Sequence, residues 1–340
     1  MSVTMTRPQV AAGRDAGARP WTFARGLAVF GAVLLAYEAI TIVRWLASGP
    51  TQVTADRDTS AASFVAAQIY LAVMIAVSIW VLVFVVRQCR RAGRLTFDAQ
   101  MIIGCGAALF WDPFGNFIQP AFFYSSNWIN LNTWAGDAPG VVNTDAGLMP
   151  QPVFIMLVYP FGLLVFTMFS NLVMRATRRR FPGWSNARVL AVGSVTAFFA
   201  AMTLEAPMFL LHLWSLPGAP AELSLFDDNH RYASVEYLTT AMVFAGLAAV
   251  RFFKDDHGRA FTERGVSQTG AVLAVVGWCC SLLLVLQLFV TYFAFKADPY
   301  PEGFPPHLVN GLCDVGATTD THYGPCPGSP GFRLPTSLPD

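Results

Sequence analysis

Apolar stretches of about 20 residues recur along the chain, and this is the length that one α-helix needs to cross the hydrocarbon core of a bilayer. The 340 residues are 54% hydrophobic and 13% charged, which is about half the charged fraction of a soluble domain. Inside a bilayer the backbone must satisfy its own hydrogen bonds, so such stretches are expected to be helical. We therefore predict an all-α polytopic membrane protein with about seven spans, near residues 26–47, 63–86, 99–123, 153–174, 188–213, 234–252 and 270–295.

Basic residues gather in alternate connections between these spans, whereas residues 124–152 contain neither Lys nor Arg. The positive-inside rule then places the N-terminus in the cytoplasm and, with seven spans, the C-terminus outside. We predict three parts: a cytoplasmic N-terminal tail at 1–25, a seven-helix membrane domain at 26–296 with an outer loop at 124–152, and a Pro- and Gly-rich extracytoplasmic tail at 297–340.

Several function classes are disfavoured by what the chain contains. The net charge is +1 and the two lysines are Lys254 and Lys296, so nothing suggests a nucleic-acid partner. The run Gly104–Gly106 is not followed by the further glycine of a dinucleotide loop, and a Walker sequence is absent. We expect no cofactor. One group of potential metal ligands has a spacing that matches no metal-site template, so we also expect no metal. This group comprises Asp227, Asp228, His230 and Glu236.

Polar side chains inside the predicted spans indicate a cavity, because such groups normally face a partner or water rather than lipid. Most of them fall in the outer half of the bilayer once the helices are oriented. We therefore predict a cavity near the outer leaflet, covered by residues 124–152. The residues concerned are Glu38, Arg44, Asp112, Asn116, Gln119, Glu205, His212, Glu236 and Tyr237.

Two acids stand beside prolines, where helices kink or break. Asp112 precedes Pro113 and would become an N-cap favouring its ionised form if a helix restarts there. Glu205 lies two residues before Pro207 in an apolar stretch and should hold its proton more tightly. One charged and one protonated carboxyl suit general-acid catalysis through a cationic transition state. His212 would share a helical face with Glu205 and could orient it or relay its proton.

Simpler explanations exist for each of these residues. Asp112 could have the purely structural role of capping a broken helix, and Glu205 could serve only to pack against a neighbouring helix. His212 could be an ordinary interfacial histidine. Aromatic residues near position 120 could line an apolar pocket or form an interfacial belt. The predicted catalytic residues are Asp112, Glu205 and His212, and the predicted substrate-binding residues are Trp111, Asn116, Gln119, Phe123, Tyr124, Trp134 and Tyr237.

The cysteines divide by expected compartment. Cys105, Cys279 and Cys280 lie in apolar spans and are expected to be packing residues. Cys313 and Cys326 lie in the tail that the topology places outside, where a disulfide bridge can form.

One group of residues resembles the signature of the spirocyclase AveC family: Trp111, Asp112, Pro113, Asn116, Tyr124, Asn127, Trp134, Pro139, Gly140, Pro150, Gln151 and Pro152. The family pattern often has an acid between the last two prolines, where this chain has Gln151, so no acid role is carried to that position. The resemblance implies a multi-pass protein of the bacterial plasma membrane, with the lipid bilayer and a polyketide macrolide as partners. Family members act in avermectin- and milbemycin-type pathways, closing a dihydroxy ketone into a spiroketal, and some also dehydrate the product.

Spiroketal formation fits the chemistry expected from the two acids. Glu205 would protonate the departing hydroxyl of a hemiketal, and Asp112 would stabilise the resulting oxocarbenium ion, as paired carboxyls do in glycoside hydrolysis. The alternative is a transporter or exporter of a lipophilic polyketide, because broken helices with polar groups are also transporter features. We find no internal repeat, which disfavours a transporter, and the oligomeric state is left open.

Overall fold

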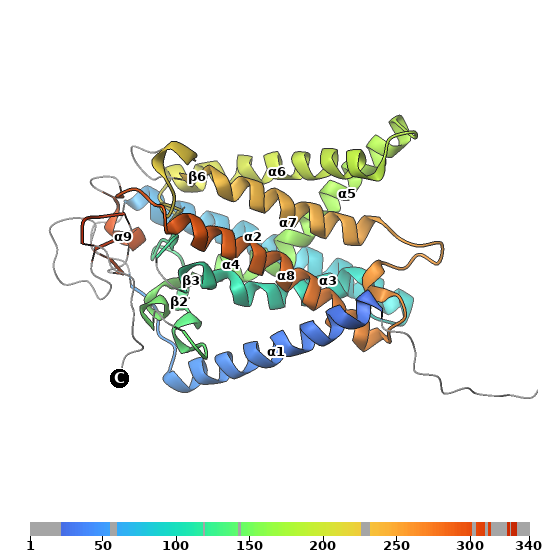
Figure 1. Cartoon of the computed structure of the whole chain (residues 1–340), viewed down its shortest axis with the longest axis horizontal. Helices are drawn as coiled ribbons and strands as arrows, with labels where there is room; N and C mark the ends of the chain where they lie inside the picture. Colours follow the sequence, from blue (N-terminus) through green and yellow to red (C-terminus); the bar gives the residue numbers. More distant parts are fainter. Residues whose placement is uncertain are drawn as a thin grey trace, which may run out of the picture.

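In a computed structural model, the chain is described over residues 22–54, 60–117, 120–141, 144–225, 232–300, 304–309, 312–313, 325–326 and 328–331. The described part is mostly helical, as predicted, and contains five helices long and apolar enough to cross a membrane. These are α1 (Phe23–Ser48), α2 (Ala61–Ala92), the continuous segment Val153–Arg180, which ends with α5 (Leu163–Arg180), α6 (Asn186–Leu210) and α8 (Gln268–Ala294). Helix α7 (Ser234–Phe252) lies beside them (Figure 1).

The helices lie side by side along the long axis of the molecule, so the connections gather at two ends (Figure 1). One end carries the start of α1 and the connections that follow α2, α5 and α7, with their basic residues, and is here called the arginine-rich end. The other carries residues 120–152, the chain after α6 and the chain after α8, and is here called the loop end. The basic residues of the alternate connections, as far as the structure describes them, thus lie at the same end of the bundle.

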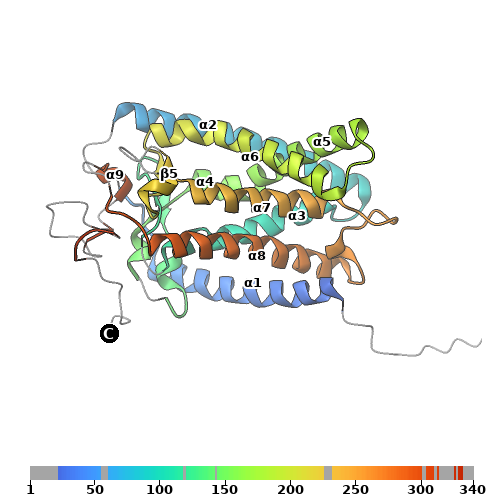
Figure 2. The same cartoon turned by 45° about the horizontal axis from the view of Figure 1, so that its top comes forward.

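Helix α8 is the centre of the bundle, with α1 on one side and α7 on the other (Figure 2). Half of its apolar window is buried (50%), compared with 28% in each of the other four long helices. Glycines allow α1 to approach it closely: a Cβ at Gly31 would lie 2.1 Å from the Leu273 carbonyl oxygen, and one at Gly277 would lie 2.3 Å from that of Leu27. Small residues at helix contacts are what dense packing in a membrane requires.

The predicted third span is wrong in its second half. Helix α3 (Phe97–Ala108) continues as a tighter 3₁₀ segment, η1 (Leu109–Asn116), and no helix extends to residue 123. Pro113 cannot donate a backbone hydrogen bond, and its ring crowds the preceding turn. The chain then turns back toward the bundle at the loop end.

Three short antiparallel pairs add strand structure to the helical fold that we predicted. Strand β1 (Phe123–Tyr124) pairs with β4 (Trp214–Ser215), β2 (Asn130–Asn132) with β3 (Pro150–Pro152), and β5 (Ser224–Leu225) with β6 (Tyr232–Ala233). Single-turn segments complete the connections: η2 (Ala135–Asp137), η3 (Thr144–Leu148), η5 (Ala221–Leu223), η6 (Phe261–Glu263) and α9 (Pro306–Val309).

The described part of the C-terminal segment packs onto the loop end. The backbone N–H of Ser126 donates to the His307 carbonyl at 3.1 Å, and the Tyr300 hydroxyl donates to the Pro120 carbonyl at 3.3 Å. Burial lowers the pKa of His307 below its usual value. Cys313 and Cys326 form a disulfide bridge, which the sequence analysis had left open.

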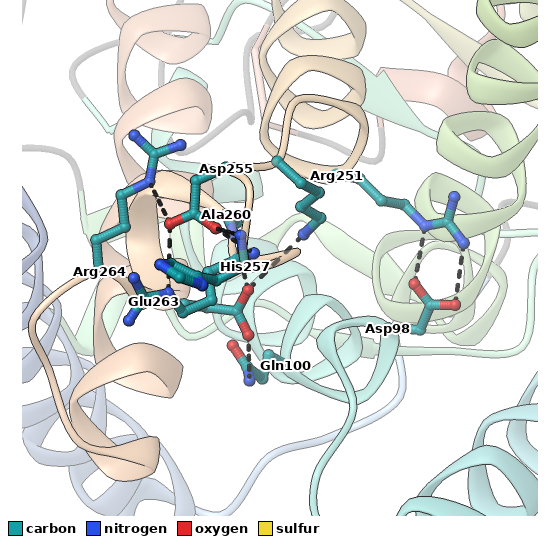
Figure 3. Close-up of polar contacts among 10 residues, drawn as sticks. Asp98, Gln100, Arg251, Asp255, His257, Ala260, Glu263 and Arg264 are labelled. Atoms are coloured by element: carbon teal, nitrogen blue, oxygen red, sulfur yellow. Dashed lines mark hydrogen bonds and ion pairs between the residues drawn. The ribbon is translucent and has the colours of Figure 1, made fainter.

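An ion pair joins three helices at the arginine-rich end. Arg251 of α7 donates from Nε and Nη2 to the two carboxylate oxygens of Asp98 on α3, at 2.8 and 3.0 Å (Figure 3). Its Nη1 donates to Asn171 Oδ1 on α5 at 3.0 Å. The side chains of Arg251 and Asp98 are only 17% and 9% exposed. Such a bidentate contact fixes the position of α7 relative to α3.

The α7–α8 connection is held against the start of α3 by Lys254. Its ammonium lies 3.4 Å from the centre of the Phe97 ring and 3.8 Å from Glu263 Oε2. Burial lowers the pKa of Lys254 from 10.5 to about 8, although the nearby Glu263 carboxylate opposes this shift.

We predict that Arg251→Met destabilises the protein by roughly 3 kcal/mol, because it leaves the buried Asp98 carboxylate without its cation. The melting temperature in detergent, followed by tryptophan fluorescence, should fall by several degrees. The matched control is Arg259→Met, since Arg259 is 49% exposed in its ion pair with Asp255, and exposed pairs contribute little. Equal losses in the two variants would contradict this assignment.

Candidate functional site

A mostly apolar cavity of ≈ 330 Å³ lies among α2, α6, α7, α8 and the Val153–Arg180 segment, with η1 and the β1–β4 pair contributing to its wall. Tyr124 and Trp214, which face each other in the β1–β4 pair, place it toward the loop end. A few polar side chains interrupt the apolar wall, among them Asp112, Tyr159, Glu205 and Gln287. Cavities of this size and composition are typical of small-molecule sites.

Asp112 is the most enclosed acid in the cavity wall, with 4% of its surface exposed. The Tyr159 hydroxyl donates to Oδ1 at 2.6 Å, and the Tyr124 hydroxyl lies 3.2 and 3.1 Å from Oδ1 and Oδ2. Gln151 Nε2 donates to Oδ2 at 3.2 Å. Burial works against a charge at this position, and three donors aimed at the carboxylate work in its favour.

Separate elements bring these donors to Asp112. Tyr124 is held in β1 opposite Trp214 of β4, and Gln151 is held in β3 opposite Leu131 of β2. Tyr159 lies in a π-helical turn, Val158–Gly162, that interrupts the long segment. Pro160 follows Tyr159 directly within this turn. Prolines and π turns are common causes of local distortion in a helix, and such a distortion changes the direction of the side chains beside it.

The predicted N-cap role of Asp112 is wrong. Asp112 is the fourth residue of η1, and no helix restarts at Pro113. Its carboxylate is instead satisfied by side chains from distant parts of the sequence.

Glu205 also lines the cavity, from α6, where it is partly buried. Helix α6 continues through Pro207 and ends at Leu210. His212 therefore lies in the turn beyond the helix, with a left-handed φ of 54°, and its ring centre is 5.9 Å from that of His307. The prediction that His212 shares a helical face with Glu205 is wrong, and His212 is not among the residues that line the cavity.

Of the predicted substrate-binding residues, Tyr124 lines the cavity, and three aromatic residues are used elsewhere. Trp111 donates to Glu38 Oε1 at 2.9 Å, and Trp134 donates to the Phe110 carbonyl at 2.8 Å. Phe123 is fully buried against two aromatic rings of the C-terminal segment. Some predicted positions lie outside the described residues: Gln119, Asp227, Asp228, His230 and the side chains of Glu236 and Tyr237.

The structure adds residues that the sequence analysis did not assign to the site. Tyr159 precedes a proline within an apolar run, as Asp112 does, and this shared pattern was the available signal. Gln287 is an isolated amide within an apolar run of α8, which was a second signal. Trp214 lies in a short connection and gave no such indication.

The cavity reaches the side of the bundle between α2 and α6. Val73 and Leu204 belong to its wall and are 59% and 55% exposed on the apolar surface of these helices. The Tyr70 hydroxyl joins the two helices by donating to the Leu204 carbonyl at 3.1 Å. In a bilayer, this opening would face the acyl chains.

Asn116 forms the turn that returns the chain to β1. Its Oδ1 accepts from the backbone N–H groups of Ala121 and Phe122 at 2.6 and 3.1 Å. Its Nδ2 donates to the Phe122 carbonyl at 2.8 Å. Asn116 is buried and is not among the residues that line the cavity, so these contacts give it a structural role.

We predict that Asn116→Ala lowers the free energy of unfolding by about 1–3 kcal/mol, because two buried N–H groups lose their acceptor. The exposed Asn186, at the start of α6, gives the control Asn186→Ala. Thermal denaturation in detergent should distinguish the two variants. An Asn116→Ala protein as stable as the native chain would rule out the turn role.

Comparison with known proteins gives one match. The family model described as "Spirocyclase AveC-like" matches residues 92–301, which include α3, η1, the connection at residues 120–152, α6, α7 and α8. No curated protein matches the chain, and no solved structure matches it.

Proposed function

We propose that the cavity beside Asp112 is where a dihydroxy ketone closes into a spiroketal, because the chain belongs to the AveC-like spirocyclase family. Membership of this family implies a cyclase that acts in spiroketal formation during macrolide biosynthesis. The observation that carries the proposal is a buried carboxylate with three neutral donors, in an apolar cavity whose wall also holds a second acid, Glu205.

The reaction needs an acid and a stabiliser of positive charge. One hydroxyl of the substrate adds to the ketone and gives a hemiketal. Protonation of the hemiketal hydroxyl lets it leave as water, which generates an oxocarbenium ion. The second hydroxyl attacks the cationic carbon and loses its proton, so that the net change is the loss of one water from the dihydroxy ketone.

We assign the proton transfers to Glu205 and the stabilisation of the cation to Asp112. Glu205 protonates the departing hydroxyl and, as a carboxylate, recovers a proton from the attacking hydroxyl. The hydrogen bonds from Tyr159, Tyr124 and Gln151 favour the carboxylate form of Asp112, which would offset the charge of the oxocarbenium ion in a low-dielectric cavity. This is the division of labour found between paired carboxyls in glycoside hydrolysis.

The shape of the cavity suits a large lipophilic substrate. Its volume is in the range of sites that enclose one drug-sized group, so the reacting part of a macrolide would be enclosed while the remainder lies in the opening between α2 and α6. Enclosure holds a flexible chain in the conformation that leads to one stereoisomer, which is where an enzyme adds most to a reaction that acid alone can drive.

We further propose seven spans in the bacterial plasma membrane, with the arginine-rich end in the cytoplasm. The disulfide bridge at the loop end supports this orientation, since such bridges persist outside the reducing cytoplasm. The site would then open within the outer half of the bilayer.

The orientation predicts opposite accessibility of two introduced cysteines in a Cys89→Ser background. In intact cells, a membrane-impermeant maleimide should label Leu223→Cys at the loop end, where Leu223 is 42% exposed. It should label Gly183→Cys, in the exposed α5–α6 connection, only after permeabilisation. Reversed labelling would contradict the proposed topology.

Catalysis is tested by replacing each acid with its amide. Purified Glu205→Gln and Asp112→Asn should convert an open-chain dihydroxy-ketone macrolide about 10²- to 10⁴-fold more slowly than the native protein at neutral pH. The exposed acid at the loop end gives the control Glu222→Gln, which should retain full activity. Phe166→Leu, in the cavity wall, should change the stereoisomer ratio while leaving the acids in place.

Product would be measured by chromatography with mass detection. Full activity in both acid variants would overturn the proposed roles, and a native protein that binds the macrolide without converting it would favour transport instead.

A further inference from the structure

Gln287 is an amide embedded in an apolar stretch of α8, Leu282–Val290. It is only 5% exposed, and it lines the same cavity as Asp112. A buried amide in such surroundings is costly unless its donors and acceptor are used.

The carbonyl oxygen of this amide is not used by the protein. Within the described part of the chain, Gln287 Oε1 is buried without a hydrogen-bond partner, and it is the one such atom that belongs to a residue of the cavity wall. Buried polar atoms are nearly always paired in native proteins, so an unpaired one in a cavity wall indicates a partner that binds there.

The turn that carries Asp112 makes room for the amide. A Cβ at Gly115 would lie 2.4 Å from Gln287 Oε1 and 2.7 Å from Phe122 Cε1, so a side chain at this position would displace the amide and the ring. Gly115 follows Asp112 by three residues in η1, and residues three apart lie on the same side of a 3₁₀ helix. The Thr291 hydroxyl, one turn further along α8, donates to the Gly115 carbonyl at 3.4 Å and fixes this contact.

We propose that Gln287 positions the substrate by accepting a hydrogen bond from one of its hydroxyl groups, next to the carboxylate of Asp112. An amide does not ionise near neutral pH, so Gln287 is a positioning residue and not an acid or base. It would hold one hydroxyl in place while the other adds to the ketone. This inference rests on the proposed function for its reaction, but the binding that it describes can be measured without turnover.

The test uses a long-chain diol and its dimethyl ether, neither of which can form a ketal. The ether keeps its oxygen acceptors and loses the O–H donors that Gln287 Oε1 requires. In detergent, the native protein should bind the diol about tenfold more tightly than the ether, which is the effect of one well-placed hydrogen bond. Gln287→Leu should prefer the diol clearly less than the native protein does, and any remaining preference would come from the Asp112 and Glu205 carboxyls of the same cavity. Its melting temperature should be unchanged, because the substitution removes an unpaired polar group from the interior.

Two further variants sharpen the result. Gly115→Ala should also reduce the preference for the diol, since its Cβ displaces the amide. The control Gln100→Leu changes a glutamine that is also buried and has an unpaired oxygen, but that lies outside the cavity wall, and its preference should match that of the native protein.

A Gln287→Leu protein that prefers the diol as strongly as the native protein does, or a native protein without any preference, would overturn the inference. Loss of the preference in Gln287→Leu, combined with a native protein that produces no spiroketal, would support the binding role while refuting the proposed reaction.

Discussion

The need to hydrogen-bond one buried carboxylate organises much of this structure. Asp112 lies in apolar surroundings, where an unsatisfied charge would be prohibitive. Its donors come from three places: the return of the chain into β1, the β2–β3 pair and the π turn at Tyr159. Each of these departs from regular membrane helix, and together they bring the donors to one point. Part of the irregular backbone thus serves to satisfy this carboxylate.

The two sides of the bundle differ in how tightly their helices are joined. Helices α1 and α8 meet at glycines whose missing Cβ atoms allow backbone contact, and Arg251 joins α7 to α3 and α5. On the other side, α2 and α6 meet through a single described hydrogen bond from Tyr70, beside the opening of the cavity. A rigid frame on one side and a lightly joined wall on the other suit a site that must hold acids in place and admit a bulky apolar molecule.

The candidate site separates polar groups by role. Asp112 is enclosed by donors, whereas Glu205 lines the same cavity from α6, a helix that continues through Pro207. Gln287 contributes an acceptor that the protein leaves unpaired. These three groups come from η1, α6 and α8, which are far apart in the sequence. Only the packing of these elements brings the three groups into the wall of one cavity.

The sequence by itself determined that the chain is mostly helical with long apolar segments, that the basic residues are grouped, and that the family resemblance lies at Trp111–Pro113. It did so because hydrophobic length and local charge act over single segments. The selection of Asp112 and Glu205 also followed from local signals, an acid beside a proline in an apolar run. Only the tertiary structure decided where η1 ends, that His212 lies beyond α6, and that Tyr159, Gln151 and Gln287 belong with the site. Hydrogen-bond partners from distant elements leave no periodicity in the sequence, and a proline shows that a helix is perturbed without showing whether it bends, tightens or stops.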